Sequence, residues 1–494
     1  MALLIDLMDL IDSEKDEKMK NLLFDNLEKM YIFGCDNLEK CGITDIMKRK
    51  IYNQLLKWKH QNGKYAVLIE GARRTGKSYI AEEFARGEYD SYLLIDFNKA
   101  DKIIWDWFDN YLNDLDTLFM NLQIQYGVKL IPRKSVIIFD EVQLCPRARS
   151  AIKYLVADGR YDYIETGSLI SIKKNVKGIV IPSEEMSLQM HPMDFEEFLW
   201  AMGEDMMMPF IRDCFEKRRP LGGLHRKAID YFRTYMIVGG MPQAVQTFKE
   251  TKDFDQVDLT KRAILNLYKS DISKYADGLE YKVKSIFEQI PSELQKHEKK
   301  FRLASLEEHA AYRDYDDAFF WLSDSKVVNI CYGSTAPNIG LRLNMERNTL
   351  KCYMADTGLL ISMAFDEKGR VPNEIYQKLL HNKLEINEGM LVENIVAQML
   401  TAAGHRLYFY SNSSRENAGE RMEIDFLVSK GKITSRHNIF PIEVKSSTRY
   451  TLSSLKKCMV KFGDFLATPY VLHGKDLQEK DGITYLPLYM AELL

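Results

Sequence analysis

Residues 65–86, YAVLIEGARRTGKSYIAEEFAR, hold the strongest fold signal of the chain. A short apolar strand is predicted from Tyr65 to Ile69, the loop GARRTGKS follows, and a helical stretch comes next. The loop matches G-x-x-x-x-G-K-S in the strand–loop–helix context that the motif requires. In that context the loop N–H groups and the helix N-terminus face a bound anion. The segment therefore predicts a phosphate-binding loop.

Each position of this loop has a predicted part in holding ATP. Lys77 would reach the β- and γ-phosphates, and Ser78 would ligand Mg²⁺. The residues predicted to contact the nucleotide in the loop are Gly71, Ala72, Arg73, Arg74, Thr75, Gly76, Lys77 and Ser78. The alternative is a glycine-rich turn that matches by chance, and the flanking strand and helix argue against it.

A second apolar strand, SVIIFDEVQ at residues 135–143, ends in two acids. Its uninterrupted apolar run fits a parallel strand that is buried on both faces. Asp140 is placed to hold Mg²⁺, and Glu141 to polarise an attacking water as a catalytic residue. These two acids alone could cap a helix, but beside the phosphate-binding loop the catalytic interpretation is favoured.

Two further strands are predicted in the same half of the chain. YDYIETGS at residues 161–168 ends in Thr166 and Ser168, polar groups that could contact the γ-phosphate or the water. SYLLIDF at residues 91–97 supplies another strand. The ends of such strands are where an open α/β sheet binds its ligands.

Length and charge limit the possible partners. At 494 residues the chain has room for roughly three domains of ~150 residues. Its 68 Lys plus Arg and 71 Asp plus Glu give a formal net charge of -3. A large basic footprint is therefore absent, and any nucleic-acid contact must come from local patches.

The cysteines, histidines and N-terminal residues point to an intracellular protein. The seven cysteines contain no C-x-x-C pair and the nine histidines no H-E-x-x-H, so neither a zinc site nor a disulfide framework is indicated. The first residues, MALLIDLMDLIDSEKDEK, are acidic where a signal peptide is basic. No apolar run approaches the ~18 residues that span a bilayer. We expect a cytoplasmic protein with reduced thiols and no membrane contact.

Several motifs in a specific order resemble one known family. GARRTGKS, FDEVQ, ETGSL, MHPMDFEEFLWA and VGGMPQAV are similar to a bacterial family of AAA+-type ATPases whose members carry a C-terminal domain of unknown function that resembles PD-(D/E)xK nucleases. The similarity extends roughly from Met47 to Tyr470. It implies a doubly wound P-loop core that binds and hydrolyses ATP. AAA+ kinship also suggests a homo-oligomeric ring, with Arg147, Arg149, Arg226 and Arg233 as unranked candidates for a trans-acting arginine.

The order of elements suggests five parts along the chain. They are an N-terminal helical segment (1–60), the P-loop ATPase core (61–200), a helical lid (201–280), a winged-helix-like connector (281–345) and a PD-(D/E)xK nuclease-like α/β domain (346–494). In the first part, apolar residues recur at helical spacing at Leu3, Leu7, Leu10, Leu23, Leu27 and Met30. This stripe could bind a partner, but packing on the protein's own core is favoured.

The connector raises the question of DNA binding. Three short helices followed by a hairpin-like tail resemble a winged helix, which often places its third helix in the major groove. Here that helix begins with Asp314, Asp316 and Asp317, which would repel phosphate. A structural connector is favoured, with Phe319, Phe320, Trp321 and Leu322 in its core.

The last ~120 residues contain a helix, three strands, a second helix and a strand, which is the core order of the nucleases that the resemblance implies. In RMEIDFLV, Asp425 lies on the face opposite Met422 and Ile424. In PIEVKSS, Glu443 and Lys445 share a face. If the strands pair as a meander, Asp425, Glu443 and Lys445 converge on one surface.

This surface could hold a catalytic metal. Asp425 and Glu443 would ligand Mg²⁺, and Lys445 would steady a water or a phosphate. Two helix acids could add a further ligand. A helical wheel places Glu388 on the inward apolar stripe, whereas the family's G-x-x-x-E arrangement selects Glu393, which we prefer as the catalytic and metal-binding residue.

Two functions stay open for the C-terminal part. It could cleave DNA or RNA under nucleotide control, or it could bind a partner or nucleic acid without cutting while ATP hydrolysis resets a switch. Acids that alternate with aliphatics are also common on solvated strands. Residues 381–494 hold 14 basic and 13 acidic side chains, which is weak electrostatic attraction for a DNA-cleaving domain.

Overall fold

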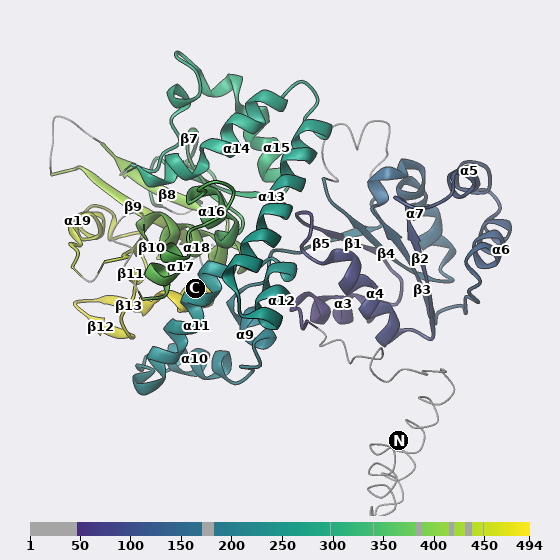
Figure 1. Cartoon of the computed structure of the whole chain (residues 1–494), viewed down its shortest axis with the longest axis horizontal. Helices are drawn as coiled ribbons and strands as arrows, with labels where there is room; N and C mark the ends of the chain where they lie inside the picture. The colour runs from purple at the N-terminus through teal and green to yellow at the C-terminus, as the bar shows by residue number, and fades with distance from the viewer. Residues whose placement is uncertain are drawn as a thin grey trace, which may run out of the picture. The chain divides into compact units, whose positions relative to one another are not determined.

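A computed structural model describes most of the chain beyond its first 46 residues (Figure 1). The described residues are 47–169, 182–296, 298–338, 340–381, 388–413, 419–429, 437–447 and 449–494. The predicted apolar stripe from Leu3 to Met30 lies outside these ranges. Of the predicted N-terminal helices, the structure describes α3 (Ile51–Lys59).

Five parallel strands form the first sheet, in the order β2-β3-β4-β1-β5. Their bounds are β1 Ala66–Glu70, β2 Ser91–Asp96, β3 Ser135–Asp140, β4 Asp162–Gly167 and β5 Glu185–Gln189. Strand β4 lies between β1, which leads into the phosphate-binding loop, and β3, which ends in Asp140. The carboxyl ends of three predicted strands are therefore neighbours, and the predicted parallel α/β core is confirmed.

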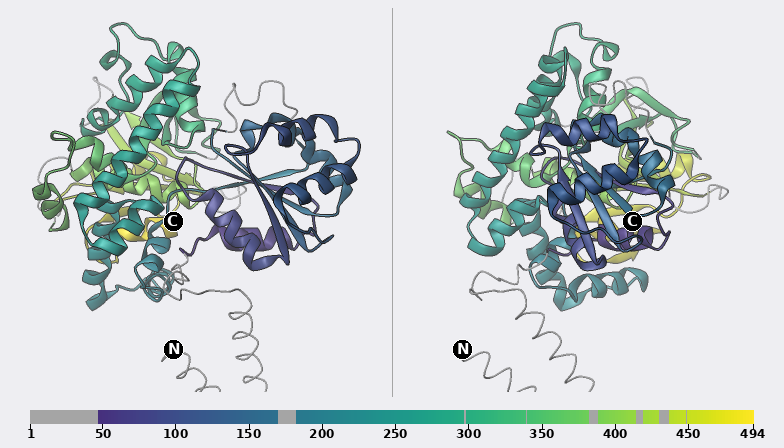
Figure 2. Two further views of the ribbon diagram at one scale, coloured as in Figure 1. Left: turned by 45° about the vertical axis from the view of Figure 1, so that its right-hand side comes forward. Right: turned by 90° about the vertical axis from the view of Figure 1, so that its right-hand side faces the viewer.

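Helices cover both faces of this sheet, as the turned views show (Figure 2). Val67 and Ile69 of β1 pack with α3 and α4 (Lys77–Glu88), whereas Leu68 faces the opposite layer. That layer consists of α5 (Lys102–Asn110), α6 (Leu115–Tyr126) and α7 (Pro146–Asp158). Alternate residues of a buried strand thus serve two apolar cores, which explains its continuous hydrophobic run.

A helical region follows the first sheet. Its helices are α9 Phe195–Ala201, α10 Met207–Glu216, α11 His225–Val238, α12 Pro242–Thr251, α13 Phe254–Tyr275, α14 Glu280–Gln295, α15 Asp316–Asp324, α16 Thr357–Ala364 and α17 Asn373–Leu380. Short 3-10 turns occur at η1 Val142–Leu144, η2 Gly222–Leu224, η3 Leu303–Ser305, η4 Tyr312–Asp314 and η5 Leu488–Leu493. The 22-residue α13 contacts α12, α14 and α16.

The second sheet has eight strands in the order β12-β13-β11-β10-β9-β8-β6-β7. Their bounds are β6 Val328–Ser334, β7 Met345–Met354, β8 Tyr408–Asn412, β9 Met422–Ser429, β10 Ile439–Val444, β11 Tyr470–His473, β12 Gln478–Lys480 and β13 Ile483–Pro487. With α18 (Glu388–Ala402) and α19 (Ser453–Phe462), the chain runs α18-β8-β9-β10-α19-β11, the element order expected from the sequence. The nuclease likeness of this region stays a prediction.

The winged-helix interpretation is not confirmed. Its middle helix is replaced by the 3-10 turns η3 and η4. The hairpin of β6 and β7 does not stand apart as a wing, because β6 also pairs with β8 in the large sheet. The expected core residue Phe320 is 64% exposed, whereas Phe319, Trp321 and Leu322 are buried as expected. The predicted boundary at residues 345–346 falls at the start of β7.

Two of the family motifs meet Asp356, which lies just after β7, at a junction of the helical region with the second sheet. The N–H of Gly240, from VGGMPQAV, donates to Asp356 Oδ2 at 2.6 Å, and its carbonyl accepts from Met193 N at 2.6 Å. A Cβ at Gly240 would lie 2.1 Å from the Met193 carbonyl oxygen, so only glycine fits there. Asp356 also caps α16 by accepting from Leu359 N. The motif therefore has a packing explanation.

Two further findings concern the whole set of described residues. None of the helices that the structure describes is long and apolar enough to cross a membrane. The five cysteines within the described ranges are free and buried, at Cys145, Cys214, Cys331, Cys352 and Cys458.

Candidate functional site

The phosphate-binding loop runs from the end of β1 to the start of α4. Lys77, the first residue of α4, is almost fully buried. Its ammonium donates to the backbone carbonyls of Gly71 at 3.1 Å and Ala72 at 2.9 Å. Burial lowers the pKa of Lys77 to about 8, although Glu141 and Asp140 act to raise it. The loop thus holds a buried ammonium whose hydrogen bonds go to backbone carbonyls.

Three predicted residues meet at the carboxyl ends of neighbouring strands. Ser78 Oγ donates to Asp140 Oδ1 at 2.6 Å, and Thr166 Oγ1 donates to the same oxygen. Burial raises the pKa of Asp140, and the hydrogen bonds from Ser78 and Thr166 act to lower it. A serine hydroxyl and a carboxylate at one point are oxygen groups that suit Mg²⁺ beside a nucleotide. These residues therefore fit the metal.

Glu141 lies one residue beyond β3 in a left-handed conformation, with φ of 52°. Ser168 Oγ donates to its Oε2 at 3.3 Å, and Gln143 Nε2 donates to the same oxygen. Left-handed residues other than glycine are uncommon, and strained backbone clusters at functional sites. The structure thus brings Ser168 to Glu141 and Thr166 to Asp140, so the carboxyl end of β4 holds the two acids at the end of β3.

Residues outside the loop fix its path. Arg49, just before α3, donates to the carbonyl of Thr75 at 2.7 Å and pairs with Glu197 at 3.1 Å. A Cβ on Gly71 would lie 2.2 Å from the carbonyl oxygen of Met190, so glycine is required at this close approach. The sequence contained no local signal for Arg49, because its contacts are with distant segments.

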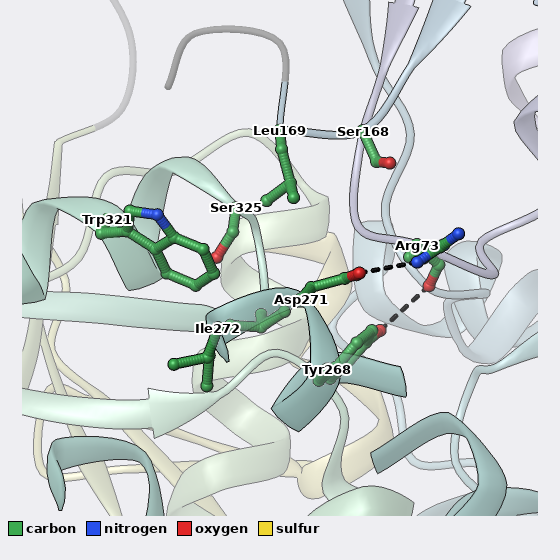
Figure 3. A pocket seen from close by; sticks show the side chains of 9 residues that line it. Arg73, Ser168, Leu169, Tyr268, Asp271, Ile272, Trp321 and Ser325 are labelled. Atoms are coloured by element: carbon green, nitrogen blue, oxygen red, sulfur yellow. Dashed lines mark hydrogen bonds and ion pairs between the residues drawn. The ribbon is translucent and has the colours of Figure 1, made fainter. Parts of the chain in front are cut away.

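Helix α13 also contacts the loop, through Arg73. Figure 3 shows the Arg73 side chain paired with Asp271, at 2.6 Å, and the Tyr268 hydroxyl donating to the Arg73 carbonyl at 3.0 Å. Burial raises the pKa of Asp271, Arg73 acts to lower it, and Glu141 acts to raise it. Asp271 therefore lies within electrostatic reach of the catalytic candidate Glu141. Neither Tyr268 nor Asp271 was predicted from the sequence.

The four candidate finger arginines differ in their surroundings. Arg149 is 3% exposed and pairs with Glu185 at 3.0 Å in the core of the first sheet, so it is not available to a neighbouring subunit. Arg147 and Arg226 are exposed. Arg233 lies on α11, away from the loop, beside α17 and the start of α18.

The predicted C-terminal residues form a larger group, here named the acid–lysine cluster. Its members are Lys299, Lys351, Glu393, Glu423, Asp425, Glu443 and Lys445. Strands β7, β9 and β10, helix α18 and the segment after α14 supply them. Four carboxylates and three ammonium groups thus meet on one side of the large sheet.

Asp425, Glu443 and Lys445 converge as the strand pattern predicts. Asp425 Oδ2 accepts from Val444 N at 2.8 Å, and Lys445 Nζ donates to Glu443 at 2.7 Å. Burial and the nearby Asp425 together raise the pKa of Glu443 to about 8, although Lys445 acts to lower it. Burial likewise raises the pKa of Asp425. One proton shared between these acids would relieve their repulsion.

Glu393, the preferred helix acid, contacts two lysines and a tyrosine. Lys299 and Tyr353 donate to it, and Lys351 Nζ lies 3.1 Å from its Oε1. Burial acts to raise the pKa of Glu393, but Lys299 and Lys351 outweigh it and lower that pKa to about 2. Glu388, the alternative acid, lies apart from the cluster and faces Arg233.

Lys351 is the centre of this cluster. Its side chain is fully buried and lies 2.9 Å from Glu423 and 4.0 Å from Asp425, in addition to Glu393. Burial acts to lower its pKa, but the three carboxylates raise it well above the ordinary value. Each acid predicted to bind a metal therefore already faces a lysine. Within the described ranges, no three His, Cys, Asp or Glu side chains are grouped so that they could hold a metal ion.

Sequence reasoning missed Lys299, Lys351 and Tyr353, and although the alternation in RMEIDFLV places Glu423 on the face of Asp425, it assigned Glu423 no role. A signal for Lys351 and Tyr353 was present, because they alternate with Leu350, Cys352 and Met354 in LKCYM. Such alternation places the lysine and the tyrosine on one face of a strand. No local pattern marked Lys299.

Three family models match parts of the chain. Residues 63–199 match the AAA domain, residues 229–369 match a domain of unknown function (DUF8612), and residues 388–490 match another (DUF4143). The first match supports an AAA+-type P-loop ATPase core, as the sequence resemblance predicted. Lys299 and Lys351 lie in the second matched region, and the four acids of the cluster lie in the third. No curated protein matches the chain.

Several solved structures are similar to parts of this chain at low sequence identity and low TM-score. The Walker-type ATPase paby2304 of Pyrococcus abyssi is 16% identical, with 65% of this chain and 97% of that chain covered and a TM-score of 0.37. PCH-2 of C. elegans is 13% identical, with coverage of 46% and 71% and a TM-score of 0.27. Cdc6p from Pyrobaculum aerophilum is 12% identical, with coverage of 68% and 96% and a TM-score of 0.23.

Proposed function

We propose that the chain binds ATP with Mg²⁺ at the phosphate-binding loop and hydrolyses it. The observation that carries the proposal is the hydrogen bond between Ser78 and Asp140, at 2.6 Å, beside the buried ammonium of Lys77. The hydroxyl, the carboxylate and the ammonium are the three groups that a P-loop site needs, and they lie at the carboxyl edge of a parallel sheet. The match of residues 63–199 to the AAA domain supports it independently.

The residues of the site divide the chemistry among them. Loop N–H groups and Lys77 would bind the β- and γ-phosphates, with Lys77 exchanging its carbonyl partners for phosphate oxygens. Ser78 and Asp140 would hold Mg²⁺, which when bound neutralises charge on the phosphates. Glu141, fixed by Ser168 and Gln143, would orient and polarise the attacking water. Thr166 would keep Asp140 aimed at the metal.

Two substitutions test this assignment. In Glu141→Gln, ATP binding should persist while hydrolysis falls by about a hundredfold or more, since general base catalysis contributes ~10²–10⁴-fold. In Lys77→Ala, binding itself should be lost. Phosphate release and binding of a fluorescent ATP analogue measure the two steps, with the exposed Glu250→Gln as matched control. Unchanged hydrolysis in Glu141→Gln would remove Glu141 from the mechanism.

The second candidate function is cleavage of nucleic acid by the acid–lysine cluster. The convergence of Asp425, Glu443 and Lys445 on neighbouring strands favours it. Mg²⁺ could bind there only if Asp425 and Glu393 gave up contacts with lysines, because a lysine and a metal compete for the same oxygens. The alternative that keeps the lysines in place is an ATP-dependent switch whose C-terminal part binds a partner without cutting.

Cleavage assays separate these two possibilities. Labelled single- and double-stranded DNA and RNA would be incubated with Mg²⁺ or Mn²⁺, with and without ATP. Under the nuclease hypothesis, Glu443→Ala and Lys445→Ala lose cleavage and keep ATP hydrolysis, while Lys77→Ala reveals whether nucleotide controls the cut. Intact ATP hydrolysis without cleavage under any condition would favour the switch.

A further inference from the structure

A cavity of about 150 Å³ lies at the carboxyl ends of three parallel strands of the large sheet. Strands β10, β11 and β13 are parallel neighbours, and residues within three positions of the end of each line the cavity, together with α11 and the start of α18. A water molecule takes about 10–15 Å³ of such volume, so the space suits a group larger than a few waters. The carboxyl ends of parallel strands are where α/β sheets bind ligands.

The cavity is distinct from the acid–lysine cluster but adjacent to it. Ser446 and Ser447 line the cavity and directly follow Lys445 in the segment after β10. Ser447 and the lining residue Lys475 are exposed, so the cavity opens to solvent. A ligand could enter here without displacing any contact of the cluster.

The charged groups of the cavity favour an anion. Arg233 reaches it from α11, and Lys475 from the segment after β11. Among the residues that the structure describes, the Arg233 guanidinium has only long contacts, at 3.4 Å to the Leu380 carbonyl and 3.8 Å to Asp230, which leave most of its five donors available within these ranges. Arginine is well suited to phosphate, because its planar fork can donate two parallel hydrogen bonds.

Glu388 is the opposing charge. Its carboxyl lines the same cavity, where burial raises its pKa and Arg233 acts to lower it. An ionised Glu388 competes with an incoming anion for Arg233, whereas a protonated one can donate a hydrogen bond to it. Glu388 therefore sets how strongly the cavity attracts negative charge.

A buried imidazole completes the polar lining. His473 is 1% exposed, and its Nδ1 lies 3.0 Å from the Tyr450 hydroxyl. Its Nε2 is buried and forms no hydrogen bond of standard geometry with the described residues. Burial lowers the pKa of His473, partly offset by the backbone of Asp476, so the ring is neutral at neutral pH. A buried polar atom without a full partner is costly unless a ligand or water satisfies it.

We propose that this cavity binds a terminal phosphate group, a phosphomonoester carried by the end of a nucleic-acid strand or by a mononucleotide. A phosphomonoester carries close to two negative charges at neutral pH, which match the two cations, whereas an internal phosphodiester carries one. The two serine hydroxyls, the Tyr450 hydroxyl and the His473 imidazole supply neutral partners for its oxygens. The inference requires neither ATP hydrolysis nor strand cleavage, and it stands if both fail.

Binding can be measured without either activity. The full chain carrying Lys77→Ala, which removes the competing phosphate site of the loop, would be titrated in EDTA. The probes are short single-stranded DNAs with a fluorophore at one end and either a phosphate or a hydroxyl at the other, in both polarities. Fluorescence anisotropy gives the dissociation constants. Unlabelled AMP and inorganic phosphate serve as competitors, which distinguish a strand end from a small phosphomonoester as the source.

We expect phosphate-ended probes, or AMP, to bind at least about tenfold more tightly than their hydroxyl-ended counterparts, because hydrogen bonds to charged groups are the strong ones. Arg233→Met should remove this preference, and Glu388→Gln should increase it. Arg226→Met, an exposed arginine on the same helix, should leave it unchanged. Opposite effects of two cavity variants could not come from misfolding. Equal binding of phosphate and hydroxyl ends, with no response to AMP, phosphate or Arg233→Met, would overturn the proposal.

Discussion

The phosphate-binding loop and the acid–lysine cluster both bury a lysine, but they satisfy its charge in opposite ways. Lys77 donates to two backbone carbonyls, and burial lowers its pKa to about 8. Lys351 faces three carboxylates, which raise its pKa in spite of complete burial. The first ammonium is held by neutral dipoles, and the second by full negative charges.

This difference indicates which site is ready for an anionic ligand. A buried ammonium that has exchanged its hydration water for neutral carbonyls gains a large electrostatic stabilisation when phosphate oxygens replace those carbonyls. An ammonium that already forms several buried ion pairs gains little stabilisation from a further anion. Its carboxylate partners are already neutralised, so they attract a metal ion only weakly. The comparison therefore assigns ligand capture to the loop, whereas the cluster in this conformation is a closed ionic network.

The largest expected effect is on stability at the cluster. Lys351→Met should lower the free energy of unfolding by about 3–5 kcal/mol, because removal of one partner leaves buried carboxylates unpaired. Urea unfolding measures the loss, and the exposed Lys480→Met is the matched control. Adding Glu393→Gln to Lys351→Met should recover part of the loss. A stability change below about 1 kcal/mol in Lys351→Met would show that the network is not closed.

The same substitution at the loop should have the opposite profile. Within the described residues Lys77 forms no ion pair, so Lys77→Met leaves no carboxylate there without its partner. The free energy of unfolding should therefore change by less than about 1 kcal/mol. ATP binding should nevertheless weaken by at least about a hundredfold, since two or more charge-assisted hydrogen bonds to phosphate are lost. Isothermal titration with ATP tests this. A large loss of stability with retained binding would reverse the comparison.

The pH dependence of the cluster gives a finer test. Glu443 has a folded pKa of about 8 against an ordinary value of 4.5, so between these values the folded chain holds a proton that the unfolded chain releases. Its contribution to stability is therefore complete below about pH 4.5 and is lost as the pH rises through 8. Glu393, with a folded pKa of about 2, acts in the opposite sense and loses its contribution as the pH falls from 4.5 towards 2.

The substitution Glu443→Gln should isolate the first of these effects. We expect it to reduce the fall in unfolding free energy of the wild type between pH 5 and 8, as measured by urea unfolding across that range. Glu479→Gln, on an exposed strand, should leave the slope unchanged. Identical pH profiles for Glu443→Gln and the wild type would mean that Glu443 is ionised in the fold.

The sequence was informative wherever function depends on neighbours along the chain. The loop residues from Gly71 to Ser78 are contiguous, and Asp140 and Thr166 each end an apolar strand, so strand order alone brings them together. Asp425, Glu443 and Lys445 were predictable for the same reason, because strand alternation fixes their face.

The lysines that occupy the acids of the cluster could not be predicted from the strand pattern. Lys299 and Lys351 contact Glu393 across 94 and 42 residues, and only the folded chain brings them together. The helical wheel correctly placed Glu388 on an inward-facing side of its helix, but it could not show which groups Glu388 would meet. In the structure Glu388 lines the cavity beside Arg233. Phe320 is a case in which the expected burial was wrong, because this apolar residue lies in a core-like run of sequence but is exposed in the structure.

The smallest expected effect concerns the link between α13 and the loop. Asp271 places a negative charge near Lys77 and Glu141, and its pair with Arg73 is partly exposed and therefore weak. Asp271→Asn removes that charge from the neighbourhood of the phosphates, so ATP should bind about two- to fivefold more tightly with little change in stability. The exposed Asp277→Asn, just beyond α13, is the matched control.

The kinetic constants for ATP hydrolysis would show how Asp271 acts. If it only opposes phosphate binding, Asp271→Asn lowers KM and leaves kcat unchanged. If its pair with Arg73 instead positions the loop for catalysis, kcat falls in Asp271→Asn and in Arg73→Met alike, because either substitution removes that side-chain link between the loop and α13. The first outcome would mean that the Asp271 carboxylate weakens the affinity of the loop for ATP. The lysines of the acid–lysine cluster would likewise weaken the affinity of its acids for a metal. The second outcome would mean that the ion pair at the loop positions catalytic groups, whereas the ion pairs of the acid–lysine cluster only occupy its acids.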